Sequence, residues 1–210
     1  MSDLNQDLFQ LAMSEKARPL MAAVQKHIAE NVEPITEEFF RLNDEKTDRW
    51  SWHPRQLELL EGAKNKAKES GLWNFFLPDS EIGSGLTNLD YAYIAVELGK
   101  SPLASESLNC SAPDTGNMEV LERVGTPAQK KKWLEPLLNG EIRSAYAMTE
   151  PDVPSSDAKN VRTSAVLDGD DWVINGEKFY ISGAGDPRCK IMIVMVRTSP
   201  DAPPSKQQLR

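Results

Sequence analysis

The sequence contains little cysteine and little histidine. Its 210 residues include two cysteines, Cys110 and Cys189, and two histidines, His27 and His53. Neither residue type shows the spacing of metal ligands, so the sequence indicates no metal site. An isolated cysteine is more often a packing residue than a reactive one, and we interpret this cysteine usage as that of a protein from a reducing, cytoplasmic compartment.

The chain also lacks an excess of basic residues. It has 24 Lys and Arg against 32 Asp and Glu, which gives a net charge of −8. A nucleic acid partner requires a basic stripe facing the phosphates, so this charge balance argues against one. Residues 1–7 are acidic rather than arginine-rich, and they predict neither a signal peptide nor a transit peptide.

No apolar run reaches the length of a membrane span. The longest strong run, Ile191–Val196, suits a buried strand instead. Hydrophobic residues make up 40% and charged residues 27% of the chain, which is typical of a soluble globular protein. We find no internal repeat, and the length allows one or two domains with a sizeable core.

The first 140 residues are expected to form helices. Four apolar residues lie three or four positions apart on one stripe: Met21, Val24, Ile28 and Val32. Pro34 is expected to end that helix, because the residue before a proline is disfavoured in the α region. A shorter helix is then expected from about Thr36, with Phe39 and Phe40 facing inward.

Later helices carry start and stop signals of their own. An apolar stripe covers residues 54–70 and ends at Gly71. Helices with a side-chain cap at the start and a glycine at the end are predicted within 87–99 and 114–125. Thr126 opens the next helix as a capping box with Gln129, and this helix is expected to run to about Leu138 and stop at Gly140.

After Gly140 the apolar period changes from helical to alternating. Five segments are predicted as strands: Arg143–Thr149, Val161–Leu167, Asp171–Ile174, Lys178–Ser182 and Lys190–Arg197. Asp168-Gly169 and Asn175-Gly176 are hairpin signals. The sequence therefore predicts an α+β fold, with a helical domain at 1–140, an incomplete antiparallel β-domain at 141–198 and a proline-rich linker or tail at 199–210.

The stretch Ala145–Asp157 is the strongest candidate for a binding site. It begins as an alternating strand, which Pro151 stops because proline cannot donate to a ladder. A polar loop with hydroxyl groups and free backbone N–H groups follows, and such a loop can present donors to an anionic or heteroaromatic ligand. Composition alone favours an ordinary strand end followed by a turn over a ligand site, because Ser, Asp and Pro are common in loops.

Three motifs in this part of the chain resemble the acyl-CoA dehydrogenase family. They are Thr126–Pro136, then Tyr-Ala-Met-Thr-Glu-Pro at 146–151 with Ser-Asp at 156–157, and Trp172–Gly183. The resemblance covers nearly the whole chain, but only the first half of the family's usual length. It implies that a C-terminal four-helix bundle is absent from this chain, so either another chain completes the unfinished sheet or this is the front piece of a longer product.

The resemblance implies an FAD-dependent enzyme that introduces an α,β double bond into an acyl-CoA thioester. Its electrons would leave to an electron-transfer flavoprotein, and the complete protein would be a homo-oligomer that acts in fatty acid metabolism. An acyl-CoA oxidase on the same fold, and a non-catalytic half-subunit that binds flavin or a partner, remain as alternatives. The acyl pocket is expected between helices and sheet, with Glu106–Gly116 as a candidate lining segment.

The resemblance also implies which residues contact FAD. Tyr146, Met148 and Thr149 match positions at the pyrimidine edge of the flavin, where donors favour reduction. Tyr180 stands where the family most often has tryptophan beside the ring, and Ser182 stands where it has threonine. Without the resemblance, Thr149 would be an ordinary strand residue, and Tyr180 could equally be a strand residue on an outer face.

The loop after Pro151 departs from the family pattern. It carries one extra residue, and Ser155 replaces the usual glycine, so the path of the loop must differ because positive φ is disfavoured for serine. The resemblance assigns Ser155 and Ser156 to the flavin pyrophosphate, and Ser156 also to the neighbouring CoA thioester.

No residue of this chain is assigned as the catalytic base. In the family that base is a glutamate from the part of the protein that has no counterpart here, so this chain alone is expected to be inactive. Glu150 and Asp157 are expected to be a surface acid and a loop cap. Five helical glutamates are expected on solvated faces: Glu97, Glu106, Glu119, Glu122 and Glu135.

Overall fold

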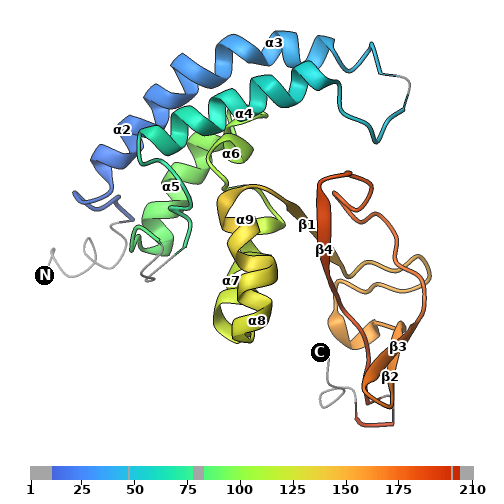
Figure 1. The fold of residues 1–210 in the computed structure, drawn as a ribbon. Coiled ribbons are helices and arrows are strands. Elements are labelled where there is room, and N and C mark those ends of the chain that lie inside the picture. Colours follow the sequence, from blue (N-terminus) through green and yellow to red (C-terminus); the bar gives the residue numbers. More distant parts are fainter. Residues whose placement is uncertain (1–10, 47, 78–82, 200, 204–210) are drawn as a thin grey trace, which may run out of the picture. The chain divides into compact units, whose positions relative to one another are not determined.

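The computed structural model describes residues 11–46, 48–77, 83–199 and 201–203. The chain divides into two compact units, Met1–Thr115 and Gly116–Arg210. The first unit is helical and the second combines helices with short strands, which confirms the α+β class (Figure 1). Among the described residues, no helix combines the length and the apolar character that crossing a membrane requires. The predicted domain boundary near residue 140 stays a prediction.

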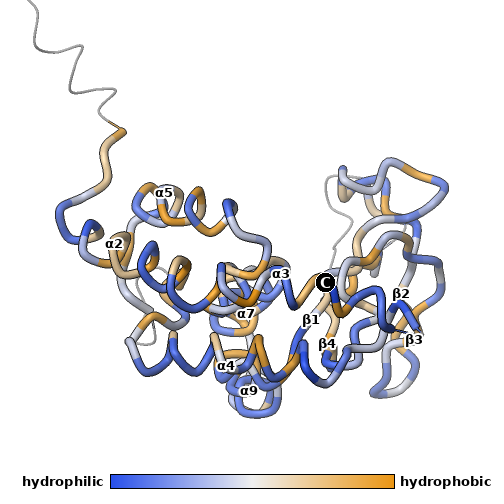
Figure 2. Tube along the Cα trace, turned by 90° about the horizontal axis from the view of Figure 1, so that it is seen from above, coloured by the Kyte–Doolittle hydropathy of each residue, from blue (hydrophilic) through white to orange (hydrophobic). Residues whose placement is uncertain are grey.

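The first unit contains one long helical rod and several shorter helices. The rod comprises α2 (Arg18–His27), η1 (Ile28–Val32) and α3 (Glu33–Arg41). The other helices are α4 (Pro54–Glu69), α5 (Asn88–Leu98) and α6 (Ala104–Ser107). Both α2 and α5 carry apolar and polar residues (Figure 2), and α5 buries one face, since its buried residues Asp90, Ile94 and Leu98 lie four positions apart.

The prediction that Pro34 ends the first helix is wrong. The chain continues through Pro34 because η1 is one π-helical turn, in which the Glu33 N–H reaches back to the Ile28 carbonyl. A wider turn of this kind accommodates the proline ring and the missing N–H that would break a regular helix. Thr36 is therefore inside α3 rather than at its start, and its hydroxyl donates to the Val32 carbonyl at 2.8 Å.

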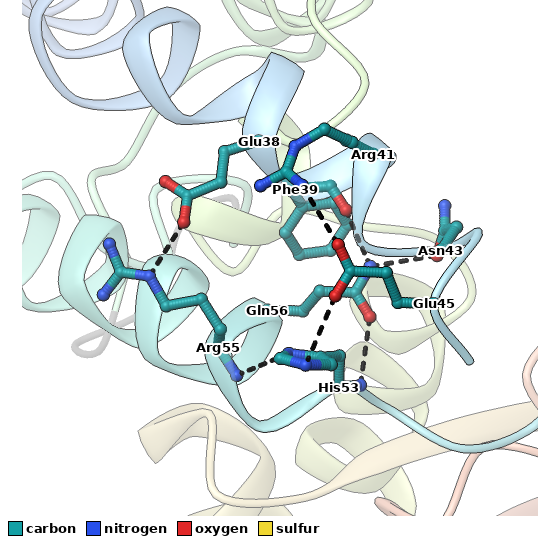
Figure 3. A network of polar contacts seen from close by, with 8 residues as sticks. All are labelled: Glu38, Phe39, Arg41, Asn43, Glu45, His53, Arg55 and Gln56. Carbon is teal, nitrogen blue, oxygen red and sulfur yellow. Dashed lines mark hydrogen bonds and ion pairs between the residues drawn. The ribbon is translucent and has the colours of Figure 1, made fainter. Parts of the chain in front are cut away.

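The corner between α3 and α4 is fixed by the buried amide of Gln56 (Figure 3). Its Nε2 donates to the Phe39 carbonyl at 2.8 Å and to Asn43 Oδ1 at 2.9 Å. Its Oε1 accepts from the His53 N–H at 3.1 Å, which completes a capping box at the start of α4. Phe39 is buried as expected, whereas Phe40 is 41% exposed, so the prediction that both rings face inward holds only for Phe39.

We expect Gln56→Met to destabilise the protein by about 2–4 kcal/mol, because it leaves buried donors and acceptors without partners. Arg41→Ala is the matched control. It removes an ion pair from the same corner, between Arg41 and Glu45. The side chains of these two residues are 64% and 47% exposed. Such a surface pair contributes less than about 1 kcal/mol. Urea unfolding of both variants measures the difference, and equal losses would contradict a structural role for the Gln56 amide.

Helices of the second unit follow the local signals in the sequence closely. They are α7 (Asp114–Val124), whose first two residues belong to the first unit, and α8 (Pro127–Gln129), η2 (Lys130–Leu134) and α9 (Glu135–Asn139). The capping box at Thr126 is confirmed, since Thr126 Oγ1 accepts from the Gln129 N–H and Gln129 Oε1 accepts from the Thr126 N–H. Gly140 has φ +73° and ends α9 as predicted. A π-helical turn again precedes a proline, Pro136, and the helix continues through it.

The strands pair differently from the predicted antiparallel sheet. β1 (Arg143–Ala147) pairs in parallel with β4 (Cys189–Val194), and only β2 (Ser164–Asp168) and β3 (Asp171–Asn175) pair antiparallel. Parallel pairing requires a long crossover, and here the chain between β1 and β4 contains the β2–β3 hairpin. The turn signal at Asp168-Gly169 is confirmed, with Gly169 at φ +62°.

The prediction of a strand at Lys178–Ser182 is wrong. This segment does run past β1 in the antiparallel sense, because the Phe179 N–H donates to the Thr149 carbonyl and Gly183 lies close to the Ser144 carbonyl. Tyr180, however, has φ +52°, a left-handed conformation that does not continue a ladder. Asn175-Gly176 consequently leads into an irregular segment and not into a second hairpin.

Candidate functional site

The centre of the candidate site is the carboxylate of Glu150, which directly follows the exposed Thr149 beyond the end of β1. Glu150 is only 6% exposed. Its Oε2 accepts from the Arg162 N–H at 2.7 Å, and its Oε1 accepts from the Thr163 N–H at 2.9 Å. The Lys178 ammonium lies 2.8 Å from Oε1. Glu150 is therefore a buried structural anion, and the expectation of a surface acid is wrong.

The hydrogen bonds of Glu150 keep it ionised. Burial by itself raises the pKa of this carboxyl, but the Lys178 ammonium and the N–H groups of Arg162 and Thr163 more than offset that effect. Together they lower the pKa of Glu150 to about 2. The carboxylate thus carries its charge throughout the physiological pH range.

Lys178 connects this carboxylate to the last residues of the β1 segment. Besides Glu150, its Nζ donates to the Met148 carbonyl at 3.0 Å. Next to it, the Phe179 N–H donates to the Thr149 carbonyl at 2.9 Å. The segment from 178 to 182 is therefore attached to residues 148–150, although about thirty residues separate the two along the sequence.

These two segments carry most of the residues predicted to contact FAD. Tyr146, Thr149 and Ser182 have exposed side chains and Met148 is half-buried, so these groups are accessible to a ligand. Tyr180 is 83% exposed. The structure brings the two segments together at Thr149 and Phe179. The contacts of these residues with FAD stay predictions.

The loop after Pro151 is closed by Ser155. Its Oγ accepts from the Glu150 N–H at 2.7 Å, and its own N–H donates to the Val153 carbonyl at 2.8 Å. Both groups of Ser155, which the resemblance assigns to the pyrophosphate, are thus engaged within the loop, and the residue is only 2% exposed. Ser156 is exposed, and Asp157 caps the short helix η3 (Ala158–Asn160) as expected for a loop cap.

A small cavity of about 180 Å³ adjoins the Glu150 carboxylate. It is lined by residues of the loop, the start of β2 and the exit of β3: Glu150, Pro151, Asp152, Arg162, Thr163, Gly176 and Glu177. The cavity is too small for a flavin, and none of the predicted flavin contacts lines it. The described residues contain no group of three or more His, Cys, Asp or Glu placed to hold a metal ion.

Two of the helical glutamates depart from the expected solvated face, because the side chains of Glu97 and Glu106 are only 18% and 17% exposed. Glu106 lies 3.3 Å from the ammonium of Lys64, a lysine whose side chain is only 3% exposed. Both residues belong to the first unit, where α4 packs against α6. This pair neutralises a buried charge, so Glu106 has a structural role.

Sequence reasoning missed the pairing of Glu150 with Lys178. Both residues stood inside the motifs already singled out, at 146–151 and 172–183. Opposite charges in two segments that were both predicted to contact the flavin were the available signal, because buried charges occur in pairs. The sequence does not show that residues 148–150 and 178–179 lie side by side, and this contact between the two segments comes from the tertiary structure.

Comparison with known proteins places this α+β chain in a family. The model of the acyl-CoA dehydrogenase N-terminal domain matches residues 14–141, and that of the acyl-CoA dehydrogenase middle domain matches residues 145–209. The chain therefore belongs to the acyl-CoA dehydrogenase family.

Curated relatives agree with this assignment. Acyl-CoA dehydrogenase family member 10 of Mus musculus is 47% identical over 93% of this chain, which corresponds to 18% of that protein. The "Probable acyl-CoA dehydrogenase FadE2" of Mycobacterium tuberculosis is 58% identical over 71% of this chain and 36% of its own length. The chain thus spans about a fifth to a third of the length of these relatives.

Solved structures share the fold. A "putative acyl-CoA dehydrogenase" from Mycobacterium abscessus superposes with a TM-score of 0.83 at 47% identity, over 91% of this chain and 48% of that one. An acyl-CoA dehydrogenase from Bacillus anthracis complexed with FAD superposes with a TM-score of 0.62 at 24% identity, over 90% of this chain and 30% of that one. The second likeness shows the fold alone.

Proposed function

We propose that this chain supplies part of the flavin-binding surface of an FAD-dependent acyl-CoA dehydrogenase. The observation that carries the proposal is the attachment of residues 178–179 to residues 148–150, which brings together two segments that the family uses for flavin. Bound FAD would supply the hydride acceptor for α,β-desaturation of an acyl-CoA thioester. The acyl-CoA substrate and an electron-transfer flavoprotein as electron acceptor are part of the same proposal.

The residues present fit such a cofactor. The exposed hydroxyls of Thr149, Ser156 and Ser182 are hydrogen-bond donors, and Tyr180 offers an exposed aromatic ring. Donors of this kind stabilise the negative charge that reduced flavin carries near N1. Tyr180 would bind the flavin ring through its face, and Ser156 would bind the pyrophosphate or the neighbouring CoA. No residue of this chain is assigned to removing the α-proton.

Thr149→Val tests this proposal. A hydrogen bond to a charged group is worth about 1.5–3 kcal/mol, so losing it from reduced flavin alone shifts the two-electron potential negative by roughly 30–65 mV. The potential is measured in the FAD-loaded protein by dye-coupled titration. Ser164→Ala removes a hydroxyl from β2, outside the predicted flavin contacts, and is expected to leave the potential unchanged. An unchanged potential in Thr149→Val with normal flavin occupancy would reduce Thr149 to a strand residue.

A further inference from the structure

We propose that Glu150 and Lys178 form one positioning unit that sets how Thr149 and the segment at 178–182 face the flavin. This inference rests on the proposed function and adds to it two residues that are not among the predicted flavin contacts. Their side chains are 4% and 12% exposed, respectively, so they act from behind the surface on which Thr149 and Tyr180 are exposed.

The contacts around Thr149 are the first argument. The Met148 carbonyl before it and the Glu150 carboxylate after it both accept from the Lys178 ammonium. The carbonyl of Thr149 itself accepts from the N–H of Phe179. Three consecutive residues of one segment are thus bonded to two consecutive residues of the other. The direction of the Thr149 side chain depends on that backbone, since the hydroxyl has only one side-chain torsion of its own.

Glu150 also forms hydrogen bonds to two further parts of the chain. Its carboxylate also accepts from the N–H groups of Arg162 and Thr163, just before β2. Its backbone N–H donates to the Ser155 hydroxyl, next to Ser156 in the loop. Glu150 therefore connects the end of the β1 segment to the loop and to the residues before β2. Through Lys178 it also connects them to the segment at 178–182.

The electrostatics explain why an ion pair suits this role. Two charges held at 2.8 Å with little solvent access are weakly screened, and additional N–H donors satisfy the carboxylate. Such a pair has a narrow range of geometries, so it holds residues 148–150 and the segment at 178–182 at one distance from each other. An exposed ion pair would not hold them at one distance, because water competes for both charged groups.

The test compares Lys178→Met, Glu150→Gln and the double variant in the FAD-loaded protein. Each single variant is expected to weaken FAD binding about tenfold or more and to move the potential of bound flavin negative, in the sense expected for Thr149→Val. The double variant is expected to lose about as much as the worse single variant, because the two residues act as one unit. Lys178→Arg retains a cation and is expected to restore part of the affinity.

Asp186→Asn provides the matched control. It breaks a half-buried ion pair with Arg188 in the same unit, at 2.7 Å and with side chains 16% and 18% exposed. It is expected to leave the FAD affinity within about twofold of the wild type. The potential of the bound flavin is expected to equal that of the wild type within experimental error. Hydrogen exchange of the Phe179, Arg162 and Thr163 amides shows whether each variant loosens these contacts while the remaining chain stays folded.

The outcomes separate this inference from the proposed function. If the wild-type protein binds no FAD, the proposed function fails and the inference falls with it. If the wild type binds FAD and the variants expose the Phe179 amide yet keep affinity and potential, the positioning role is refuted while the proposed function stands. Additive losses in the double variant would likewise refute a single unit. Lower stability with an unchanged potential of the bound flavin would leave a purely structural pair and refute the inference.

Discussion

Glu150→Ala is expected to lower the free energy of unfolding by about 3–5 kcal/mol, because it leaves the Lys178 ammonium buried without its anion. It also removes the acceptor of the Arg162 and Thr163 N–H groups. Urea unfolding of the purified protein, followed by tryptophan fluorescence, measures the loss. Glu177→Ala is the control: this glutamate lines the same cavity but is exposed, so the expected change is below about 0.5 kcal/mol.

The same carboxylate gives the protein a characteristic acid response. The pKa of Glu150 is about 2 in the folded protein, below the value of 4.5 for a free glutamate. The unfolded chain therefore binds a proton first as the pH falls, and the stabilisation is complete above about 4.5 and lost on the way to about 2. Over that range the wild type is expected to lose about 3 kcal/mol more than Glu150→Gln, which has no titrating group there. Parallel curves for the two proteins would contradict a buried, ionised Glu150.

Gly176→Ala is expected to be the second most disruptive change, at about 2–5 kcal/mol. Gly176 has φ +151°, and a Cβ added there would lie 2.7 Å from Thr163 Cα and 2.5 Å from Thr163 Oγ1. Overpacking against backbone and an unfavourable φ each cost about 1–3 kcal/mol. The alanine would push the exit of β3 away from Thr163, whose N–H binds the Glu150 carboxylate.

Gly169→Ala separates these two causes. Gly169 has φ +62° in the hairpin turn, but a Cβ added there meets nothing within 4 Å. Only the conformational cost of a left-handed residue remains, about 1–2 kcal/mol. Thermal unfolding of both variants measures the difference. Equal losses would show that the close approach of Gly176 to Thr163 is unimportant for stability.

The flavin-contact prediction illustrates what a family resemblance gives and what it omits. The motifs identified Tyr146, Thr149, Ser156 and Tyr180 as groups for FAD, and the structure leaves all four accessible. The resemblance did not identify a role for Glu150, which was expected to be a surface acid. The structure shows that this residue joins the segments on which those groups lie, because its side chain is turned inward to Lys178.

Most local signals were reliable where the interacting groups lie within a few residues of one another, although the hairpin signal at Asn175-Gly176 was not. Thr87 accepts from the Asp90 N–H at the start of α5, and Thr126 and Gln129 form the predicted capping box. Gly140 ends α9 in the left-handed region, and the tight turn at Gly169 joins β2 to β3. Each of these features depends on hydrogen bonds or φ values that a four-residue window contains.

Three features were not indicated by the sequence, and the structure decided them. β1 pairs with β4 in parallel because the intervening hairpin forms the crossover, and nothing in either strand specifies that direction. The helix continues through Pro34 because a π-helical turn accommodates the ring, although proline alone favours a break.

The third feature is the position of Glu150. By itself the sequence determined the α+β class, the helix caps, the glycine turns and the segments that resemble a flavin site. The tertiary structure decided that Glu150 is buried against Lys178, because burial and pairing of a charge depend on which segments pack together. A carboxylate in isolation favours water, and only the nearby ammonium and N–H groups of distant residues make its burial favourable.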